Sequence, residues 1–484
     1  MRILIRIVVI LLVLAGAGYG VFKYKNQPQK PDYYEYYKTQ DTTPVGKVGI
    51  FVTGLIMPEK HDHIFFYNVV HKIFKVIVPW PANKFAMVDK GVSLLDPEHV
   101  HSRKEFVPKH LEDCFGNDRD YDGTPYIVKY QQGQVFWKPP SKQLYLDHGY
   151  FIYKGRPGGQ PSVCGKVANK ARILYYDRVN TQKKLPHWQE SFKIINTTFD
   201  RLKAKYPGIE CRAESNMYYY EMKKKIDELL DAGCETIVLS SLMPVYSHFE
   251  DFNSGFRHCF EYIEEWEHAH PGKKVKVILS PQMGDFQPLR QAYLDMLKDR
   301  LDILPEGSSV TVAITVHGMP WDYFKHEAWL KLGPPYRDKV AEEVKQMLAT
   351  TYKDKFSRTN VVVCQDEFAD PIWDPKQKYL STNRAYWSAI KDGYDYAIAV
   401  PIEFLAENSD TMFHHAMKCY ENFKQFHLED PVDYPDWSVP YTRTLVEDKT
   451  TVIYNGLPVG KYQPKVIEAL YQSIDAVMAK RQGK

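Results

Sequence analysis

Two stretches with residues suited to chemistry each follow a run of β-forming residues. In ITVHGMPWDYF (314–324), the β-branched run stops at His317, and Gly318 and Pro320 turn the chain away. In YAIAVPIEFLAENSD (396–410), a second apolar run leads into a loop rich in carboxylates. An imidazole that faces carboxylates can accept protons and bind a divalent cation. The two strand ends together therefore form a candidate site.

Each of these residues also has a purely structural interpretation. A histidine beside Gly-Met-Pro is often a turn residue with a solvated ring, and His317 alone does not separate the two roles. In the carboxylate loop, Ser409 or Asp410 is expected to cap the helix that follows. The prediction of a site depends on convergence of the imidazole with the carboxylates of Glu403, Glu407 and Asp410.

Composition and missing motifs remove support from several classes of function. The chain has 63 basic and 60 acidic residues, and a net charge of +3 does not indicate a nucleic-acid partner. Its seven cysteines are dispersed without a CxxC pair, which argues against a disulfide framework and a thiolate metal centre. It has no HExxH, GxSxG, P-loop or GxGxxG motif. A share of 14% aromatic residues suits a large apolar pocket.

From about residue 215 onward, apolar runs alternate with amphipathic segments. We predict strands at 47–54, 236–242, 274–280, 309–316, 359–364 and 396–404. We predict helices at 223–233, 254–268, 287–303, 335–352, 381–393, 410–426 and 463–480. Strands that are apolar throughout are covered on both faces, so this order predicts an α/β fold with doubly wound parallel sheets. Ligands of such sheets bind at the carboxyl ends of the strands.

A similarity between two segments of the sequence predicts two similar lobes. Segments 231–251 and 391–410 share the order helix, glycine, strand, proline and acidic loop, although a chance match is the alternative. We predict a first lobe over 47–305 and a second lobe over 306–484, with one cleft between them. The first lobe is expected to carry a large irregular insertion at about 58–200, which is a candidate surface for a protein partner.

The first 46 residues differ from the rest. Residues 1–26 combine a short basic start with an apolar stretch whose length is near the minimum for a membrane span, about 17 residues. Lys23 and Lys25 follow at once, which favours an N-terminal transmembrane anchor over a cleaved signal peptide. Positive residues on both sides leave the membrane side of the main domain open. A polar linker rich in Pro and Tyr is expected over 27–46.

The ordered set of strand ends resembles the ferrochelatase family, whose members insert ferrous iron into protoporphyrin in haem biosynthesis. VGIFVTGLIMPE (48–59) is similar to the family's first strand and turn, and IVLSSLMPVYS (237–247) is similar to its Tyr-Pro-x-Tyr-Ser strand end. VAITVHGMP (312–320) and AVPIEFLAENSDTMF (399–413) are similar to its histidine and glutamate segments. The resemblance covers about 210–480 together with the first strand.

The resemblance implies roles for individual residues. His317 falls on the family's active-site histidine, and Asp410 falls where the family has its catalytic glutamate. The implied metal-side residues are His317, Glu403, Glu407 and Asp410. The implied substrate-binding residues are Met243, Tyr246, Ser247, Met319, Pro320, Phe404 and Asn408.

Two departures from the family pattern alter the wall opposite His317. Asn408 stands where many members have a second histidine, and Asn216 and Met217 replace an Arg-Tyr pair. The implied function is a ferrochelatase-like lyase that inserts a divalent metal into a porphyrin or related tetrapyrrole. Its metal, ferrous iron with zinc or cobalt as alternatives, is a substrate, and no resident cofactor is required. The departures leave open a non-catalytic chelatase-like protein that binds haem or metal at the membrane.

Overall fold

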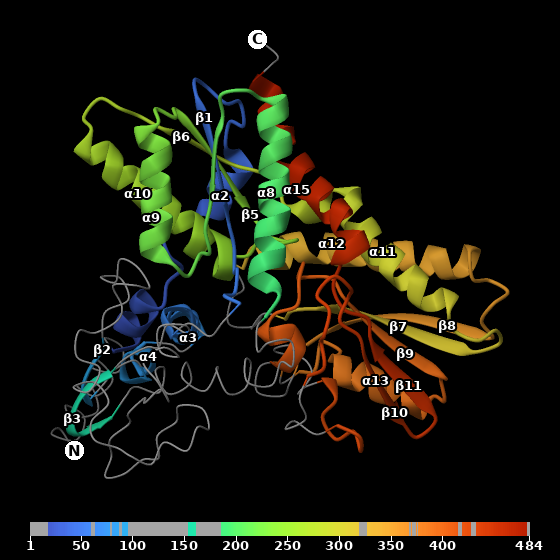
Figure 1. Cartoon of the computed structure of the whole chain (residues 1–484). Helices are drawn as coiled ribbons and strands as arrows, with labels where there is room; N and C mark the ends of the chain where they lie inside the picture. The colour runs from blue at the N-terminus through green and yellow to red at the C-terminus, as the bar shows by residue number, and fades with distance from the viewer. Residues whose placement is uncertain are drawn as a thin grey trace, which may run out of the picture.

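The computed structural model describes residues 18–59, 63–77, 80–86, 90–94, 153–160, 185–318, 327–366, 369, 374, 376–414, 419–426 and 432–481. Two largely parallel sheets, each covered by helices, organise this part of the chain (Figure 1). The prediction of a parallel α/β fold is therefore confirmed.

The first sheet has four parallel strands in the order β4-β1-β5-β6. They are β1 (Val48–Thr53), β4 (Glu210–Ala213), β5 (Thr236–Ser241) and β6 (Lys276–Leu279). Every residue of β1 and β5 is buried, as expected for central strands with helices on both faces. The helices of this half are α8 (His187–Lys205), α9 (Tyr219–Asp231), α10 (Phe256–Ala269) and α11 (Gln287–Asp302), with the π-helix η2 (His248–Gly255) directly before α10.

The second sheet has five strands in the order β10-β11-β9-β7-β8. They are β7 (Ser309–Val316), β8 (Arg358–Gln365), β9 (Tyr396–Pro401), β10 (Arg443–Glu447) and β11 (Thr450–Tyr454). All neighbours are parallel except the hairpin of β10 and β11. The helices here are α12 (Trp329–Thr350), α13 (Thr382–Lys391), α15 (Gln463–Met478) and the π-helix η4 (Asp410–His414).

The two sheets repeat one strand order. In each, the first strand of the chain lies between the second and the third: β1 lies between β4 and β5, and β7 lies between β8 and β9. The two similar segments, 231–251 and 391–410, contain β5 and β9, which are the third strands of their sheets. In this topology the chain reverses direction of winding beside the first strand, and a ligand crevice forms at its carboxyl end. His317 directly follows β7 and so occupies that place.

The C-terminal helix returns to the first sheet. Helix α15 packs against α8, α11 and β5 (Figure 1). One hydrophobic cluster also extends across both halves, from Ile50 in β1 through Tyr293 in α11 to Val312 in β7. The predicted second lobe over 306–484 therefore contributes its last helix to the packing of the first.

The predicted polar linker over 27–46 is wrong, because much of it is packed on the first sheet. It contains α2 (Tyr33–Thr39), whose N-cap Asp32 accepts the N–H of Tyr34. The Gln40 amide pairs with the backbone N–H and C=O of Leu279, at 2.8 and 2.9 Å. We call residues 31–46 the N-terminal strap. Because β6 is an edge strand, the strap occupies backbone groups that could otherwise pair with another chain.

The region predicted as an irregular insertion contains regular elements. They are α3 (His63–Ile77), α4 (Ala82–Ala86) and the antiparallel pair β2 (Lys90–Leu94) and β3 (Tyr153–Gln160). The expected end near residue 200 is wrong, because α8 begins at His187. Residues 95–152 and 161–184 of this region lie outside the described residues.

Two further differences concern the segment 410–426 and the beginning of the chain. The predicted helix at 410–426 does not reach its predicted end, since residues 420–426 form turns and irregular structure. Residues 18–25 are helical, and the described residues contain no helix that is both long and apolar enough to cross a membrane. Most of the predicted anchor falls on residues 1–17, which lie outside the described residues.

Candidate active site at the carboxyl ends of the second sheet

His317 is half-buried at the carboxyl end of the central strand β7. Its Nδ1 lies 2.7 Å from the carbonyl oxygen of Gly318, which assigns the proton of the neutral ring to Nδ1. The basic nitrogen is then Nε2. The edge of the imidazole meets the ring of Phe404 at a centroid distance of 5.9 Å. The geometry suits a proton acceptor whose orientation is set by a backbone carbonyl.

Glu403 lies one strand away, just beyond β9. Burial raises the pKa of the Glu403 carboxyl well above its usual value, although the nearby backbone N–H of His317 acts to lower it. Among the residues that the structure describes, its buried Oε1 has no hydrogen-bond partner. Burial therefore favours the protonated form of this carboxyl, and its proximity to the His317 backbone makes it a positioning group.

Two buried tyrosines hold the backbone of the 402–404 turn. The Tyr336 hydroxyl, from α12, donates to the carbonyl of Ile402 at 2.7 Å. The Tyr293 hydroxyl, from α11, donates to the carbonyl of Phe404 at 2.8 Å. Because these helices are packed into the core, the turn that carries Glu403 is fixed relative to His317.

Glu407 is fully buried farther along the same loop. The Tyr454 hydroxyl donates to its carboxyl, at 3.1 Å from Oε2. Burial raises the pKa of Glu407 to about 8, against the lowering effects of Thr411 and Tyr454. This carboxyl is therefore mostly protonated at pH 7, and it becomes a cation ligand only after losing that proton.

Asn408 caps the helical turn that begins with Asp410. Its side-chain oxygen accepts the N–H groups of Asp410 and Thr411, at 2.8 and 3.2 Å. The predicted cap at Ser409 or Asp410 is wrong, because Asn408 makes these bonds. The side chain of Asp410 is half-buried, and its carboxylate does not serve as the cap.

The predicted set of metal-side residues is not a preformed metal site. Within the described part of the chain, no three His, Cys, Asp or Glu side chains are grouped so that they could hold one metal ion. The reason is visible in the loop: Glu407 turns into the core toward Tyr454, whereas Asp410 stands at the start of η4 and is half-buried.

Of the predicted substrate-binding residues, those after β5 pack mainly into the first half of the molecule. Tyr246 has no exposed surface, and its hydroxyl lies 3.1 Å from Ser280 Oγ among the rings of Phe252 and Phe256. Tyr246 is predicted to line a pocket wall, but in the structure its side chain is enclosed by the core. Ser247 caps η2 through the N–H of Glu250, at 2.8 Å.

The remaining predicted substrate-binding residues have different settings. Met243 is half-buried, whereas Phe404 and Asn408 are buried. Met319 and Pro320 lie outside the described residues.

Met57 connects the two halves beside the carboxylate loop. Its sulfur lies 3.0 Å from the Ser409 hydroxyl and 3.4 Å from the Ser409 backbone nitrogen. Its own N–H donates to Nδ1 of His187 at 2.9 Å, and burial lowers the pKa of His187 to about 3. His187 is therefore a neutral acceptor. Sequence reasoning missed this link because each partner is an isolated residue in its own segment.

Asp366 is a further acidic residue at this edge of the sheet that sequence reasoning did not select. It follows β8 directly, and its Oδ1 accepts hydrogen bonds from the Thr382 hydroxyl and, at 3.1 Å, from the Cys419 thiol. Its negative charge raises the pKa of Glu403 further. A polar residue directly after an apolar β-forming run was the signal that identified His317, and the run at 359–364 gives the same signal here.

The fold and the site together define a class of protein. Its members are parallel α/β proteins with two halves, and they carry an imidazole and carboxyl groups at the carboxyl ends of one sheet. A family model described as Ferrochelatase matches residues 174–435, more than half of the 484 residues. The chain belongs to the ferrochelatase family.

Curated relatives share this family at low identity. The ferrochelatase of Thermosynechococcus vestitus is 22% identical over 206 residues, which are 42% of this chain and 49% of that protein. The ferrochelatase of Trichodesmium erythraeum is 22% identical over 172 residues, 35% of this chain and 41% of that protein. The ferrochelatase of Aquifex aeolicus is 19% identical over 289 residues, 59% of this chain and 84% of that protein. The chain thus spans about half the length of the first two relatives.

Solved structures align only loosely. SirB from Bacillus subtilis with Fe3+ has a TM-score of 0.36 and 13% identity, and the alignment covers 61% of this chain and 91% of that chain. The sirohydrochlorin chelatase SirB from Bacillus subtilis subspecies spizizenii in complex with cobalt has a TM-score of 0.31 and 12% identity, with the same coverage.

Proposed function

We propose that this chain inserts a divalent metal ion, ferrous iron first, into a porphyrin or related tetrapyrrole. Membership of the ferrochelatase family supports this class of reaction. The observation that carries it is the placement of His317 at the carboxyl end of β7, with its ring proton on Nδ1. Nε2 is then the ring nitrogen that can accept a proton in this reaction.

The proposed chemistry is a balanced exchange of one metal ion for two protons. The two pyrrole N–H groups lose their protons, and the nitrogen lone pairs bind the incoming metal. His317 Nε2 accepts these protons and passes them to solvent. Glu403 positions His317 through the backbone N–H. Asp410 is the carboxylate that meets the cation, since it is half-buried while Glu407 is enclosed.

A second candidate is a chelatase-like protein that binds haem or a metal without catalysis. The absence of a three-ligand group in the described residues favours it, as does the burial of Glu407 and Asn408. In this case the cleft binds the macrocycle, and His317 is an axial ligand to a metal that is already inserted.

Zinc insertion into protoporphyrin by the purified full chain separates the two candidates. We expect His317→Ala to reduce the rate at least about 100-fold, because it removes the general base. Asp410→Ala should lower the rate mainly at limiting zinc. His270→Ala is the matched control, since this exposed histidine bonds to the carbonyl of Trp266 and stacks on its ring, near the end of α10. If wild type binds porphyrin but its rate equals that of His317→Ala, the non-catalytic function is the correct one.

A further inference from the structure

Five buried oxygen atoms gather at the carboxyl end of the first sheet. Thr53 ends β1 and Ser241 ends β5, and the two residues are partners in the strand register. Asn216 follows β4, while Asp251 and Ser254 belong to the π-helix η2. This place corresponds to the end of β7 in the second sheet, because β1 and β7 hold the same position in the repeated strand order.

Within the described part of the chain, these five oxygens have no hydrogen-bond partner. They are Thr53 Oγ1, Asn216 Oδ1, Ser241 Oγ, Asp251 Oδ1 and Ser254 Oγ. Each of the five side chains is at most 1% exposed. Buried polar atoms are normally paired, and a group left unpaired is costly. A set of five in one region indicates an occupant.

The contacts place Thr53 and Asn216 beside Gly255, the last residue of η2, and η2 also carries Asp251 and Ser254. A Cβ built on Gly255 would lie 3.5 Å from Thr53 Oγ1 and 3.4 Å from the Cβ of Asn216. The Ser241 hydroxyl is close enough to Asp251 to lower its pKa, although it is outside hydrogen-bond geometry. The five oxygens therefore belong to one region at the ends of β1 and β5, with no hydrogen bond among them.

The charges of the region leave one carboxylate without a cation. Glu250 pairs with Lys72 at 2.6 Å, and both side chains are buried. Asp251 accepts the Ser247 N–H through Oδ2, at 2.8 Å, but makes no ion pair within the described residues. Glu250 and Lys72 are the charged groups that act on Asp251, where Glu250 raises its pKa and Lys72 lowers it.

We propose that this cluster binds one small monovalent cation, Na+ or K+, through the five oxygens. Carboxylate, amide and hydroxyl oxygens are hard donors, which suit such ions. One positive charge balances the ionised Asp251, and a divalent ion would leave an excess positive charge beside Lys72. The alternative occupant of the carboxyl is a proton, because burial raises the pKa of Asp251 to about 7. Cation and proton therefore compete.

Thermal melting of the full chain tests the site directly. At pH 8, replacing choline chloride with NaCl or KCl at equal ionic strength should raise the melting temperature of wild type by about 2 °C or more. Asp251→Asn should abolish the shift, while its oxygen can still accept the Ser247 N–H. Asp227→Asn is the matched control, since this carboxylate lies near the surface of α9 beside Lys223. If Asp251→Asn does not fold, Ser254→Ala removes one ligand without changing charge and should weaken the shift.

Competition with protons provides a second readout. Below pH 7 the apparent affinity for the cation should fall about tenfold per pH unit, because Asp251 must lose its proton first. Rubidium soaked into crystals should give one anomalous peak within reach of Asp251. Equal melting temperatures in choline, sodium and potassium at pH 8 would overturn the proposal. So would crystals in which ordered water, and no rubidium, occupies the site. Neither result would bear on zinc insertion at His317.

Discussion

The hydroxyl of Tyr454 donates to the carboxyl of Glu407 at 3.1 Å, where Glu407 has no exposed surface. This pair connects the last parallel strand of the second sheet to the loop that continues toward Asp410. Burial holds the pKa of Glu407 at about 8, above its ordinary value of 4.5. The folded state therefore binds this proton more tightly than the unfolded state does. The resulting stability is complete below about pH 4.5 and is lost as the pH rises toward 8.

Glu407→Gln should make the stability of the protein less dependent on pH. Between pH 6 and 8, wild type loses about 2 kcal/mol through this group, and the variant should not. The measurement is the free energy of unfolding in urea at both pH values. Asp251 contributes in the same direction in both proteins, so the difference between them isolates Glu407. Parallel pH profiles would show that the carboxyl is ionised in the folded state.

Tyr336→Phe should destabilise the protein by roughly 1–3 kcal/mol, because it leaves the buried carbonyl of Ile402 without a donor. Urea denaturation measures the change. Tyr352→Phe is the control, since its hydroxyl bonds to the more exposed Asp302 and should cost less. We also expect Tyr336→Phe to slow zinc insertion, because the turn that positions His317 loosens. An unchanged rate of zinc insertion would show that the Tyr336 hydroxyl does not help to position His317.

Gly456→Ala should be far more damaging than Gly393→Ala, although both glycines have positive φ. At Gly456 the new Cβ would lie 2.1 Å from the carbonyl oxygen of Tyr441, whereas at Gly393 no atom lies within 4 Å. We expect a cost of about 1–2 kcal/mol for Gly393→Ala from backbone conformation alone. Gly456→Ala should exceed roughly 3 kcal/mol or prevent folding, because a backbone atom must move. Similar midpoints in a denaturant titration would contradict this difference.

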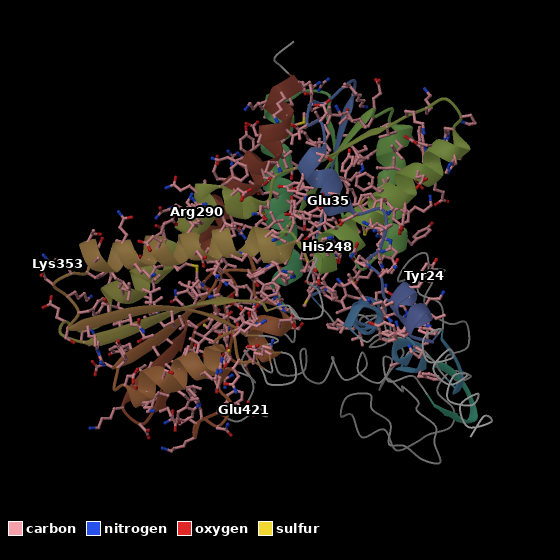
Figure 2. All side chains as sticks on the ribbon, turned by 180° about the vertical axis from the view of Figure 1, so that it is seen from behind. Tyr24, Glu35, His248, Arg290, Lys353 and Glu421 are labelled. Atoms are coloured by element: carbon pink, nitrogen blue, oxygen red, sulfur yellow. The ribbon has the colours of Figure 1, made fainter. Side chains whose placement is uncertain are left out.

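Gln40→Ala should release the N-terminal strap from the edge strand β6. The Leu279 amide donates to the Gln40 side chain, so its hydrogen exchange should accelerate at least about tenfold. The Ser280 amide, which donates to the Leu239 carbonyl inside the sheet, is the internal control. The strap also contacts His248, which lies 3.1 Å from Asp32 at its beginning (Figure 2 labels His248 and Glu35 of α2). Unchanged protection at Leu279 would mean that other strap contacts suffice.

Much of the fold could be predicted because its central strands carry continuous apolar runs. β1, β5, β7 and β9 are buried on both faces, so their hydrophobicity alone identifies them. Helix α9 shows its buried face through the spacing of Met222, Ile226 and Leu229, and Gly233 ends it with a positive φ. The hairpin of β10 and β11 was missed because β10 is a half-exposed edge strand with mixed composition.

The sequence by itself determined which residues stand at the strand ends, because strand termini follow from local composition. It placed His317, Glu403 and Asp410 in such positions, and the structure keeps His317 beside the turn of Glu403. Only the tertiary structure decided which side chains turn inward: Glu407 and Tyr246 are enclosed, Asn408 is a cap, and Asp410 stays half-exposed. Burial and pairing depend on neighbours that are distant in the chain, such as Tyr454 beside Glu407 and Met57 beside Ser409. No local pattern records those distances.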